Sequence, residues 1–411
     1  MKKIYKFILA IITVFLISIL LIFCINKPEI FNHTTHNNGE LNRSNNTSST
    51  NIESTNTDNS NDVNMTNTED NNLQNVTDLN NTENQSTSDD SVQNLDTPST
   101  NTTENVDKNS VTYNGWLHTS NTILVNEKGE TVQLRGVSSH GIEWFSNLIT
   151  YENLKTLKND WNTNIFRIAM YTDSNNTGYI FSQDQTKQKV CNIIDMAIDL
   201  DMYVIIDWHI LSDNNPQKYK EQSKAFFDYI SNKYSNNPNV IYEICNEPNG
   251  ADVTWLKDIK PYAEEVIPII RKNSEKSLII VGTADWSKGI ADCVSAPLNF
   301  DNVVYTLHFY SGSHKQELRD KIDYCLNNNI PVFVSECGLT DASGDGARYF
   351  DEFTAWINYL NDKKISWLYW SLSNKNEGSA ILLPEYNPSE NINNYLTDSG
   401  KFIRDIFINS K

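Results

Sequence analysis

Short apolar runs rich in β-branched residues alternate with longer amphipathic stretches from about residue 111 to the end of the chain. The runs are typical of buried parallel strands, and the stretches between them, such as 188–201 and 221–234, predict helices. A hairpin at 122–132, turning at Lys128-Gly129, is expected before the first strand. We expect eight strands, at residues 133–139, 164–171, 203–209, 240–246, 278–282, 303–308, 331–336 and 365–371. Eight strands that alternate with helices predict an α/β fold, a single (β/α)8 TIM barrel.

The N-terminus follows a different pattern. Three lysines within the first six residues precede an apolar run at 7–25, which predicts a membrane anchor or signal segment over 1–32. Lysines on this side favour an orientation that places the rest of the chain outside the cell. We rank a retained anchor first and a cleaved signal second. A lipoprotein comes third, because Phe23 stands before Cys24 where a small residue is expected.

Residues 33–110 contain no Phe, Tyr or Trp and consist mainly of Asn, Ser, Thr and Asp. They include thirteen acidic residues and two basic ones, so more than half of the formal net charge of −19 lies here. High charge with low hydrophobicity predicts a disordered linker. This leaves one domain, 111–411, which has the size of an α/β barrel.

Charge and cysteine content exclude several classes of function. Nucleic-acid binding needs clustered Lys and Arg, so the acidic balance argues against it. No Cys-x-x-Cys occurs, so neither a zinc site nor a redox motif is indicated, and no metal or cofactor is expected. We expect the cysteines of the domain to be small, buried apolar residues of the core. They are Cys191, Cys245, Cys293, Cys325 and Cys337.

Polar and aromatic residues interrupt the apolar runs at the C-terminal ends of the predicted strands. In (β/α)8 barrels the chemistry occurs at these ends, so their clustering favours a site over a structural network. The residues are His140, Arg167, Tyr171, His209, Asn246, Glu247, His308, Tyr310, Glu336 and Trp370. His209 and His308 lack metal-ligand spacing, and we expect them to act as hydrogen-bonding groups.

Two glutamates in this set have the arrangement that glycosidic bond cleavage requires. Glu247 and Glu336 end the fourth and seventh predicted strands, which lie across the barrel mouth from one another. Arg167 and Tyr310 can donate hydrogen bonds that favour an ionised carboxylate, so Glu336 is the predicted nucleophile. Glu247 is the predicted general acid and base, and the adjacent Asn246 can donate to a sugar hydroxyl.

Six motifs resemble those of bacterial endoglucanases of glycoside hydrolase family 5, in the bacterial cellulase subfamily. They are Arg-Ile-Ala-Met-Tyr171, Asp-Trp-His209, Asn-Glu-Pro248, His-Phe-Tyr310, Ser-Glu-Cys-Gly338 and Tyr-Trp-Ser-Leu372. The resemblance covers roughly 111–411 and implies a retaining endo-β-1,4-glucanase that uses both glutamates. It also implies supporting roles for Arg167, His209, Asn246, His308 and Tyr310. Cys337 departs from the family, which usually has Trp or Phe after the nucleophile.

Sugar rings present apolar faces that stack on aromatic side chains, and Trp370 is the best stacking candidate. Further positions resemble substrate-contacting residues of the same subfamily: His140, Trp144, Tyr171, Trp286, Lys375 and Glu377. We therefore expect a β-glucan polysaccharide as the partner, no nucleic acid, and a monomer. The domain is expected at the extracellular face of the cell, anchored by the N-terminal segment, or secreted if that segment is cleaved.

Two other readings remain open at this level. A mannanase or xylanase can use the same catalytic residues, because specificity resides in the loops. A non-catalytic surface carbohydrate-binding protein can keep the fold, although such proteins usually lose one carboxylate and this chain has both.

Overall fold

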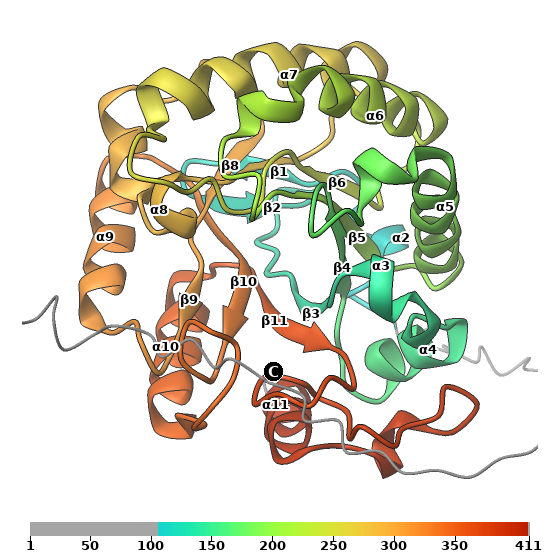
Figure 1. The fold of residues 1–411 in the computed structure, drawn as a ribbon. Coiled ribbons are helices and arrows are strands. Elements are labelled where there is room, and N and C mark those ends of the chain that lie inside the picture. The colour runs from blue at the N-terminus through green and yellow to red at the C-terminus, as the bar shows by residue number, and fades with distance from the viewer. Residues whose placement is uncertain (1–105, 410–411) are drawn as a thin grey trace, which may run out of the picture. The chain divides into compact units, whose positions relative to one another are not determined.

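The structure, a computed structural model, describes residues 106–409 (Figure 1). The predicted membrane segment and the predicted linker up to residue 105 lie outside the described residues. Within 106–409, no helix is both long and apolar enough to cross a membrane. Residues just before the predicted domain boundary contact the domain. Ser110 caps the short helix α2 (Val111–Asn114), and the Asn114 side chain donates a hydrogen bond to the Lys108 carbonyl.

Parallel strands close into a barrel seen roughly along its axis in Figure 1, which confirms the predicted (β/α)8 barrel. The order around it is β3, β4, β5, β6, β7, β8, β10 and β11, and β11 pairs with β3 to close the sheet. A short strand, β9, pairs with the end of β10. The bounds are β3 Arg135–Ser139, β4 Ile165–Tyr171, β5 Tyr203–His209, β6 Val240–Glu243, β7 Ile279–Val281, β8 Val303–Thr306, β9 Phe309–Tyr310, β10 Val332–Gly338 and β11 Trp367–Leu372.

Helices surround the barrel and connect its strands (Figure 1). The amphipathic stretches predicted at 188–201 and 221–234 correspond to α5 and α6, each with one face buried. The helices are α3 Ile142–Phe145, α4 Tyr151–Asn159, α5 Gln183–Asp199, α6 Lys220–Lys233, α7 Lys260–Asn273, α8 Ala284–Ser287, α9 Gln316–Asn327, α10 Phe350–Lys363 and α11 Asp398–Asn409.

The chain reverses at the predicted turn, Lys128-Gly129, and also once before it. Backbone N–H groups of Asn126 and Val132 donate to the carbonyls of Glu130 and Leu124 across this turn, and β2 forms a bridge with Thr131. The Asn126 side-chain oxygen supports the turn by accepting from two of its backbone N–H groups. The prediction did not include the earlier reversal, where strand β1 (His118–Ser120) pairs with β2 (Ile123–Val125).

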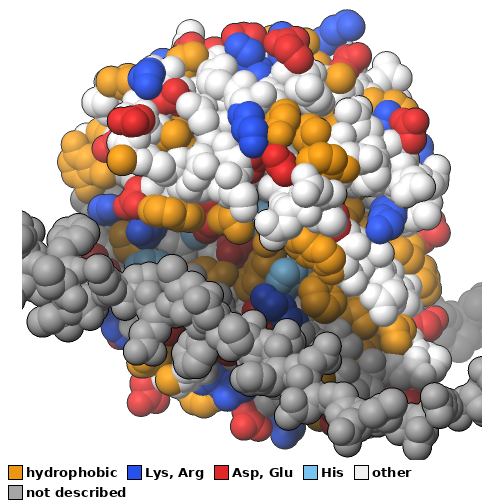
Figure 2. All heavy atoms as spheres, in the orientation of Figure 1, with side chains coloured by type: hydrophobic (Ala, Val, Ile, Leu, Met, Phe, Trp, Pro, Cys, Tyr) orange, Lys and Arg blue, Asp and Glu red, His pale blue; other side chains and the backbone are white. Residues whose placement is uncertain are grey.

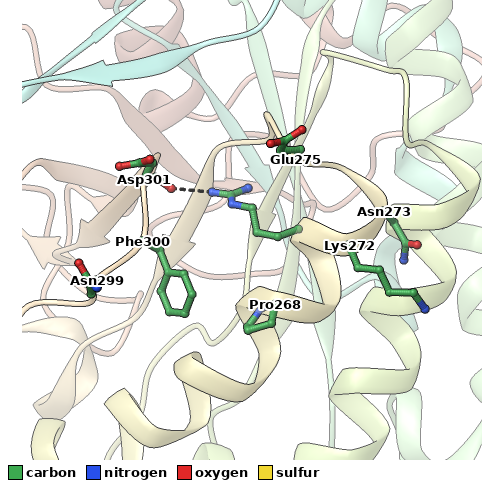
Figure 3. Close-up of a pocket in the computed structure, with 8 residues that line it drawn as sticks. Pro268, Lys272, Asn273, Glu275, Asn299, Phe300 and Asp301 are labelled. Atoms are coloured by element: carbon green, nitrogen blue, oxygen red, sulfur yellow. Dashed lines mark hydrogen bonds between the residues drawn. The ribbon is translucent and has the colours of Figure 1, made fainter.

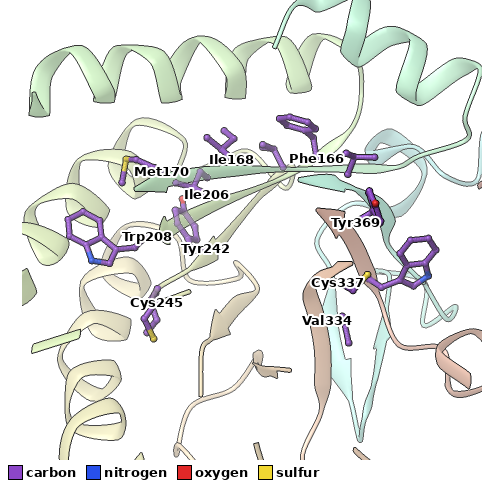
Figure 4. Close-up of a cluster of buried hydrophobic side chains, with 14 of the residues drawn as sticks. Phe166, Ile168, Met170, Ile206, Trp208, Tyr242, Cys245, Val334, Cys337 and Tyr369 are labelled. Carbon is purple, nitrogen blue, oxygen red and sulfur yellow. The ribbon is translucent and has the colours of Figure 1, made fainter. Parts of the chain in front are cut away.

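Side chains on the strands alternate between the helices and the barrel interior. On β4, Phe166, Ile168 and Met170 belong to the large apolar layer around the barrel (Figure 4). Ile165, on the other face, belongs to a second apolar layer near the N-terminal ends of the strands. Arg167 shares the face of Ile165, so the alternation places its charge inside the barrel.

A β-bulge in β10 changes this alternation where it matters for the site. Three steps along β10, from Val334 to Cys337, oppose two steps along β11. A bulge of this kind inserts one extra residue and redirects the side chains beside it. Consequently Ser335 and Glu336, although adjacent in sequence, both form hydrogen bonds inside the barrel.

A broad hollow of about 770 Å³ opens at the N-terminal end of the strands, between α7 and the loop before β8 (Figure 3). Arg271 in this hollow donates to the backbone carbonyls of Ser277 and Asp301, at 2.6 and 2.8 Å. Its guanidinium therefore joins two loops. None of the residues predicted for the site lines this hollow, and in such barrels this end contributes to stability.

Candidate active site

A buried cation lies beneath the mouth of the barrel. Arg167, on β4, is fully buried. Its guanidinium lies 2.9 Å from Asp207, 2.7 Å from Glu243 and 3.0 Å from Glu336. Burial alone would lower the pKa of Arg167, but these three carboxyl groups raise it above its ordinary value. Strands β4, β5, β6 and β10 therefore meet at one guanidinium.

We expect Arg167→Met to lower the free energy of unfolding by about 3–5 kcal/mol, because it leaves buried carboxylates unpaired. Burial would raise the pKa of Glu243, but Arg167 and His308 lower it from 4.5 to about 2. The stability that this carboxylate contributes is therefore present above pH 4.5 and is lost as pH falls toward 2. Urea unfolding at pH 7 and pH 3 measures the free energy of unfolding of both proteins. The difference in this free energy between Arg167→Met and the wild type should be smaller at pH 3 than at pH 7.

The matched control is Arg404→Met, since Arg404 is partly exposed and pairs only with the neighbouring Asp405. Its loss should change stability by less than about 1 kcal/mol at either pH. An Arg167→Met protein as stable as this control at pH 7 would contradict the role given to the buried guanidinium.

Glu336 has both carboxylate oxygens occupied by donors. Oε1 accepts a hydrogen bond from the Tyr310 hydroxyl at 2.7 Å, and Oε2 accepts from Arg167 at 3.0 Å. Burial and the carboxylates of Glu336 and Glu247 raise the pKa of Tyr310 well above its ordinary value, so Tyr310 keeps its proton and acts as a donor. These bonds fix the direction of the Glu336 carboxylate at the barrel mouth.

Glu247 follows β6, in the loop that begins after Glu243. Its Oε1 lies 2.9 Å from Nδ1 of His308, and its side chain is 12% exposed. One carboxylate oxygen of Glu247 and one of Glu336 lie within 4.8 Å of each other. The loop thus places a second, more accessible carboxyl group opposite the first.

His209 and Asn246 form a second hydrogen-bonded line to Arg167. Asn246 accepts from the Arg167 guanidinium at 2.6 Å, so its amide nitrogen is free to donate to Nε2 of His209, at 3.3 Å. The hydrogen of the imidazole is then on Nδ1, 2.6 Å from Asp207. Burial and the charge of Arg167 lower the pKa of His209 to about 4, so the ring is neutral.

Aromatic rings line one side of the mouth. The ring centroids of Trp144 and Tyr171 are 4.9 Å apart, and those of His140 and Trp370 are 5.0 Å apart. His209 links the two pairs, at 4.1 Å from Tyr171 and 5.5 Å from Trp370. The Trp370–Ser371 peptide bond is cis. This wall offers flat apolar faces beside the two carboxyl groups.

Lys375 and Glu377 lie at the edge of the aromatic wall. Lys375 Nζ is 2.5 Å from Glu377, whereas Nε2 of His140 is 3.8 Å from it. Burial, Lys375 and His209 lower the pKa of His140 to about 3, so His140 is neutral and Glu377 pairs with Lys375. The Lys375 side chain is 48% exposed and can reach a ligand.

Trp286 lies on the opposite side, in a turn of unusual backbone conformation. Asp285, Trp286 and Ser287 have φ values of 57°, 54° and 57°, which for non-glycine residues costs energy and points to function. Ser287 anchors the turn by donating to the Asn246 carbonyl at 2.7 Å and by accepting from the His308 backbone N–H. The turn leaves the Trp286 side chain 45% exposed.

A pocket of about 210 Å³ lies between this turn and the Glu247 carboxyl group. Figure 2, in the orientation of Figure 1, shows a hollow near the middle of the molecule. Hydrophobic side chains flank this hollow, and histidine atoms are visible in it. The pocket is lined by Glu247, Trp286, Lys288, His308, Tyr310, His314 and Ala342. All fourteen residues predicted for the site thus lie around one end of the barrel, seven in a hydrogen-bonded cluster and seven along the walls.

Sequence reasoning missed three buried members of the cluster: Asp207, Glu243 and Ser335. A signal for Glu243 was present, because it stands within the apolar run of a strand predicted to be buried. A fully buried carboxylate requires a cationic partner, and Arg167 stands within the apolar run of β4, two strands from β6 in the barrel.

Comparisons with known proteins identify the family of the chain. The cellulase family model (glycosyl hydrolase family 5) matches residues 125–376, more than half of the chain. Endoglucanase A of Evansella cellulosilytica is 48% identical over 278 residues, covering 67% of this chain and 56% of that protein. An endoglucanase of Clostridium saccharobutylicum is 45% identical over 296 residues, covering 72% of this chain and 65% of that protein. The chain thus matches a little over half to two thirds of these relatives' length.

Solved structures give the same result for the barrel. The cellulase Cel5C_n has a TM-score of 0.70 at 44% identity, covering 72% of this chain and 93% of that one. The catalytic domain of Thermobifida fusca endoglucanase Cel5A has a TM-score of 0.69 at 36% identity, covering 72% and 99%. The chain therefore belongs to the cellulase family, glycosyl hydrolase family 5.

Proposed function

We propose that the chain is a retaining endo-β-1,4-glucanase that hydrolyses internal bonds of cellulose or related β-glucans. The observation that carries the proposal is that one carboxylate oxygen of Glu247 lies within 4.8 Å of one of Glu336 at the mouth of the barrel. Retaining glycosidases place their carboxyl groups roughly 5–5.5 Å apart, whereas inverting enzymes leave about 6.5–9.5 Å for a water molecule. The names of the relatives given above, endoglucanase and cellulase, support a β-glucan as substrate.

In the first step, Glu336 attacks the anomeric carbon and forms a covalent glycosyl-enzyme. Arg167 and Tyr310 hold its two oxygens, so the carboxylate is already aimed before the sugar arrives. Glu247 donates its proton to the departing glycosidic oxygen. In the second step, Glu247 takes a proton from water, and the resulting hydroxide displaces Glu336 from the sugar.

Product analysis on defined cello-oligosaccharides tests the proposal. Proton NMR during hydrolysis should show the β-anomer first, and the product lengths should show internal cleavage. An initial α-anomer would overturn the retaining assignment.

Parallel assays on carboxymethylcellulose, barley glucan, mannan and xylan report the substrate class. Turnover of mannan or xylan with none on cellulose or barley glucan would overturn the assignment as a glucanase. Intact binding of glucans without any hydrolysis would favour a carbohydrate-binding protein.

The aromatic wall should contribute to substrate binding. We expect Trp144→Ala to raise KM for cello-oligosaccharides roughly 5–30-fold with a smaller effect on kcat, because about 1–2 kcal/mol of stacking is lost. Trp144 is 42% exposed and has room for a ligand on its free face. The matched control is Tyr229→Ala, an exposed aromatic residue on the outer helix α6. Equal KM values for the two variants would remove Trp144 from the binding surface.

We also propose that the domain acts outside the cell, tethered by the N-terminal segment or released when that segment is cleaved. The support is the sequence pattern of N-terminal lysines before an apolar run. Protease treatment of intact cells tests it: a protected domain would contradict an extracellular location.

A further inference from the structure

Glu243, on β6, is fully buried beneath the site and contacts two of its residues, Arg167 and Ser335. Its Oε2 accepts from Nε of Arg167 at 2.7 Å, and its Oε1 accepts from the Ser335 hydroxyl at 2.6 Å. Arg167 continues to Glu336, at 3.0 Å. Ser335 continues to Nε2 of His308, at 3.0 Å. One fully buried carboxylate is therefore connected to both of the proposed catalytic glutamates.

The direction of these hydrogen bonds follows from the chemistry of Glu243. Burial would raise its pKa, but the charges of Arg167 and His308 lower it to about 2, so the carboxylate has no proton to donate. The Ser335 hydroxyl must then donate to Glu243, and its lone pairs accept from elsewhere. Nε2 of His308 and the Thr306 hydroxyl, at 3.0 and 2.8 Å, are the two neighbours placed to donate to it.

This arrangement assigns a hydrogen to Nε2 of His308 and leaves Nδ1 facing Glu247, at 2.9 Å. The pair then shares one further proton. It resides either on Glu247 beside a neutral imidazole, or on Nδ1 of an imidazolium beside a Glu247 carboxylate. In the opposite tautomer, neutral His308 would carry its hydrogen on Nδ1 and could not accept the proton of Glu247.

We propose that Glu243 and Ser335 are positioning residues that fix the Nε2–H tautomer of His308 and thereby keep the catalytic proton between His308 and Glu247. The proton leaves this pair for the departing glycosidic oxygen and returns to it from the water that hydrolyses the glycosyl-enzyme. This inference rests on the proposed function for the role of Glu247. It goes further by giving Glu243 and Ser335, which do not touch substrate, a role in positioning His308.

The charges around His308 agree with this inference. The ring is fully buried, and burial alone would lower its pKa, but the carboxylates of Glu243, Glu247 and Glu336 raise it to about 9. The opposing cation is Arg167, which is paired with carboxyl groups. The other titratable neighbours are Asp207 and His209 on β5, and Tyr310 on β9.

The test is an NMR titration of the full chain labelled at histidine ring carbons and nitrogens, which needs no catalysis. A His308→Gln variant assigns the His308 signal among the seven histidines. In Glu243→Gln we expect His308 to titrate at least about one pH unit lower, because a buried negative charge is removed. Ser335→Ala should shift the titration in the same direction and abolish the preference for the Nε2–H tautomer.

Ser335→Ala is the safer variant, because it keeps the Arg167–Glu243 ion pair and removes only a hydroxyl. Its matched control is Ser138→Ala, a buried serine whose hydroxyl contacts Arg167 at 3.2 Å but not His308. The control should leave the titration and tautomer of His308 unchanged.

The kinetic readout is the pH profile of kcat/KM. The alkaline limb should move to lower pH in Ser335→Ala and Glu243→Gln but not in Ser138→Ala, with KM changing less than about twofold. An unchanged His308 titration in Ser335→Ala and Glu243→Gln would overturn the proposal, as would a shifted titration with an unmoved alkaline limb. A wild-type protein that hydrolyses no glucan would refute the proposed function instead, and the NMR titration would still decide the tautomer.

Discussion

Glu336→Gln should lower the rate of β-glucan hydrolysis by at least about 10³-fold, because an amide oxygen is too weak a nucleophile to form the glycosyl-enzyme. The fold should survive, since the amide oxygen can accept from Arg167 where Oε2 does, and the amide NH2 group can donate to the Tyr310 hydroxyl oxygen in place of the bond that Oε1 accepts. Initial rates on barley glucan, circular dichroism and cello-oligosaccharide binding by calorimetry measure the three properties together.

The informative result is the combination of lost turnover with retained binding. A matched control is Glu264→Gln on the outer helix α7, which removes an exposed carboxylate paired with Lys260 and should leave all three properties near wild type. Glucan turnover by Glu336→Gln within tenfold of wild type would remove this residue from the nucleophile role.

Glu247→Ala should slow hydrolysis of unactivated cello-oligosaccharides by about 10²–10⁴-fold, because the departing oxygen no longer receives a proton. Aryl cellobiosides with a dinitrophenyl leaving group should lose much less in the first step, since that group departs without protonation. Azide should then accelerate the second step, because it attacks the glycosyl-enzyme without needing a base. The product of rescue should be a β-glycosyl azide, identified by mass spectrometry and NMR.

These two variants separate the roles of the carboxyl groups. In a retaining mechanism, azide rescue that yields a β-product belongs to the acid/base residue, whereas rescue of a missing nucleophile yields an α-product. A β-glycosyl azide from a Glu336 variant, or an α-glycosyl azide from Glu247→Ala, would exchange the two assignments.

Much of the barrel could be predicted because each strand is buried on both faces and reads as an apolar run. Strand β5 begins and ends as predicted, at Tyr203–His209. The prediction extended β6 to Asn246, but the strand ends at Glu243, because the following residues turn across the mouth and bring Glu247 toward His308. Strand boundaries shift most where the chain turns to serve the site.

The position of the proposed catalytic pair at strand ends could be predicted, but the buried residues that hold it could not. Glu243 and Ser335 are ordinary residues in sequence, and their roles depend on two facts of packing. One is the period-two alternation that places Glu243 inside the barrel beside Arg167. The other is the bulge in β10, which lets Ser335 and Glu336 face the same way. A bulge of one residue does not change the composition of an apolar run, so the sequence pattern does not reveal it.

The closure of the barrel has a consequence for how the chain is synthesised. Leu134 beside β3 and Ser366 beside β11 are hydrogen-bonded across a separation of 232 residues, so the sheet cannot close until nearly the whole domain has left the ribosome. Arg167, Asp207 and Glu243 emerge well before Glu336. The guanidinium can therefore meet Glu243 before the barrel closes, and the third acid, the proposed nucleophile, joins last. Until it does, the sheet keeps open edges, the state in which a folding domain is most exposed to aggregation.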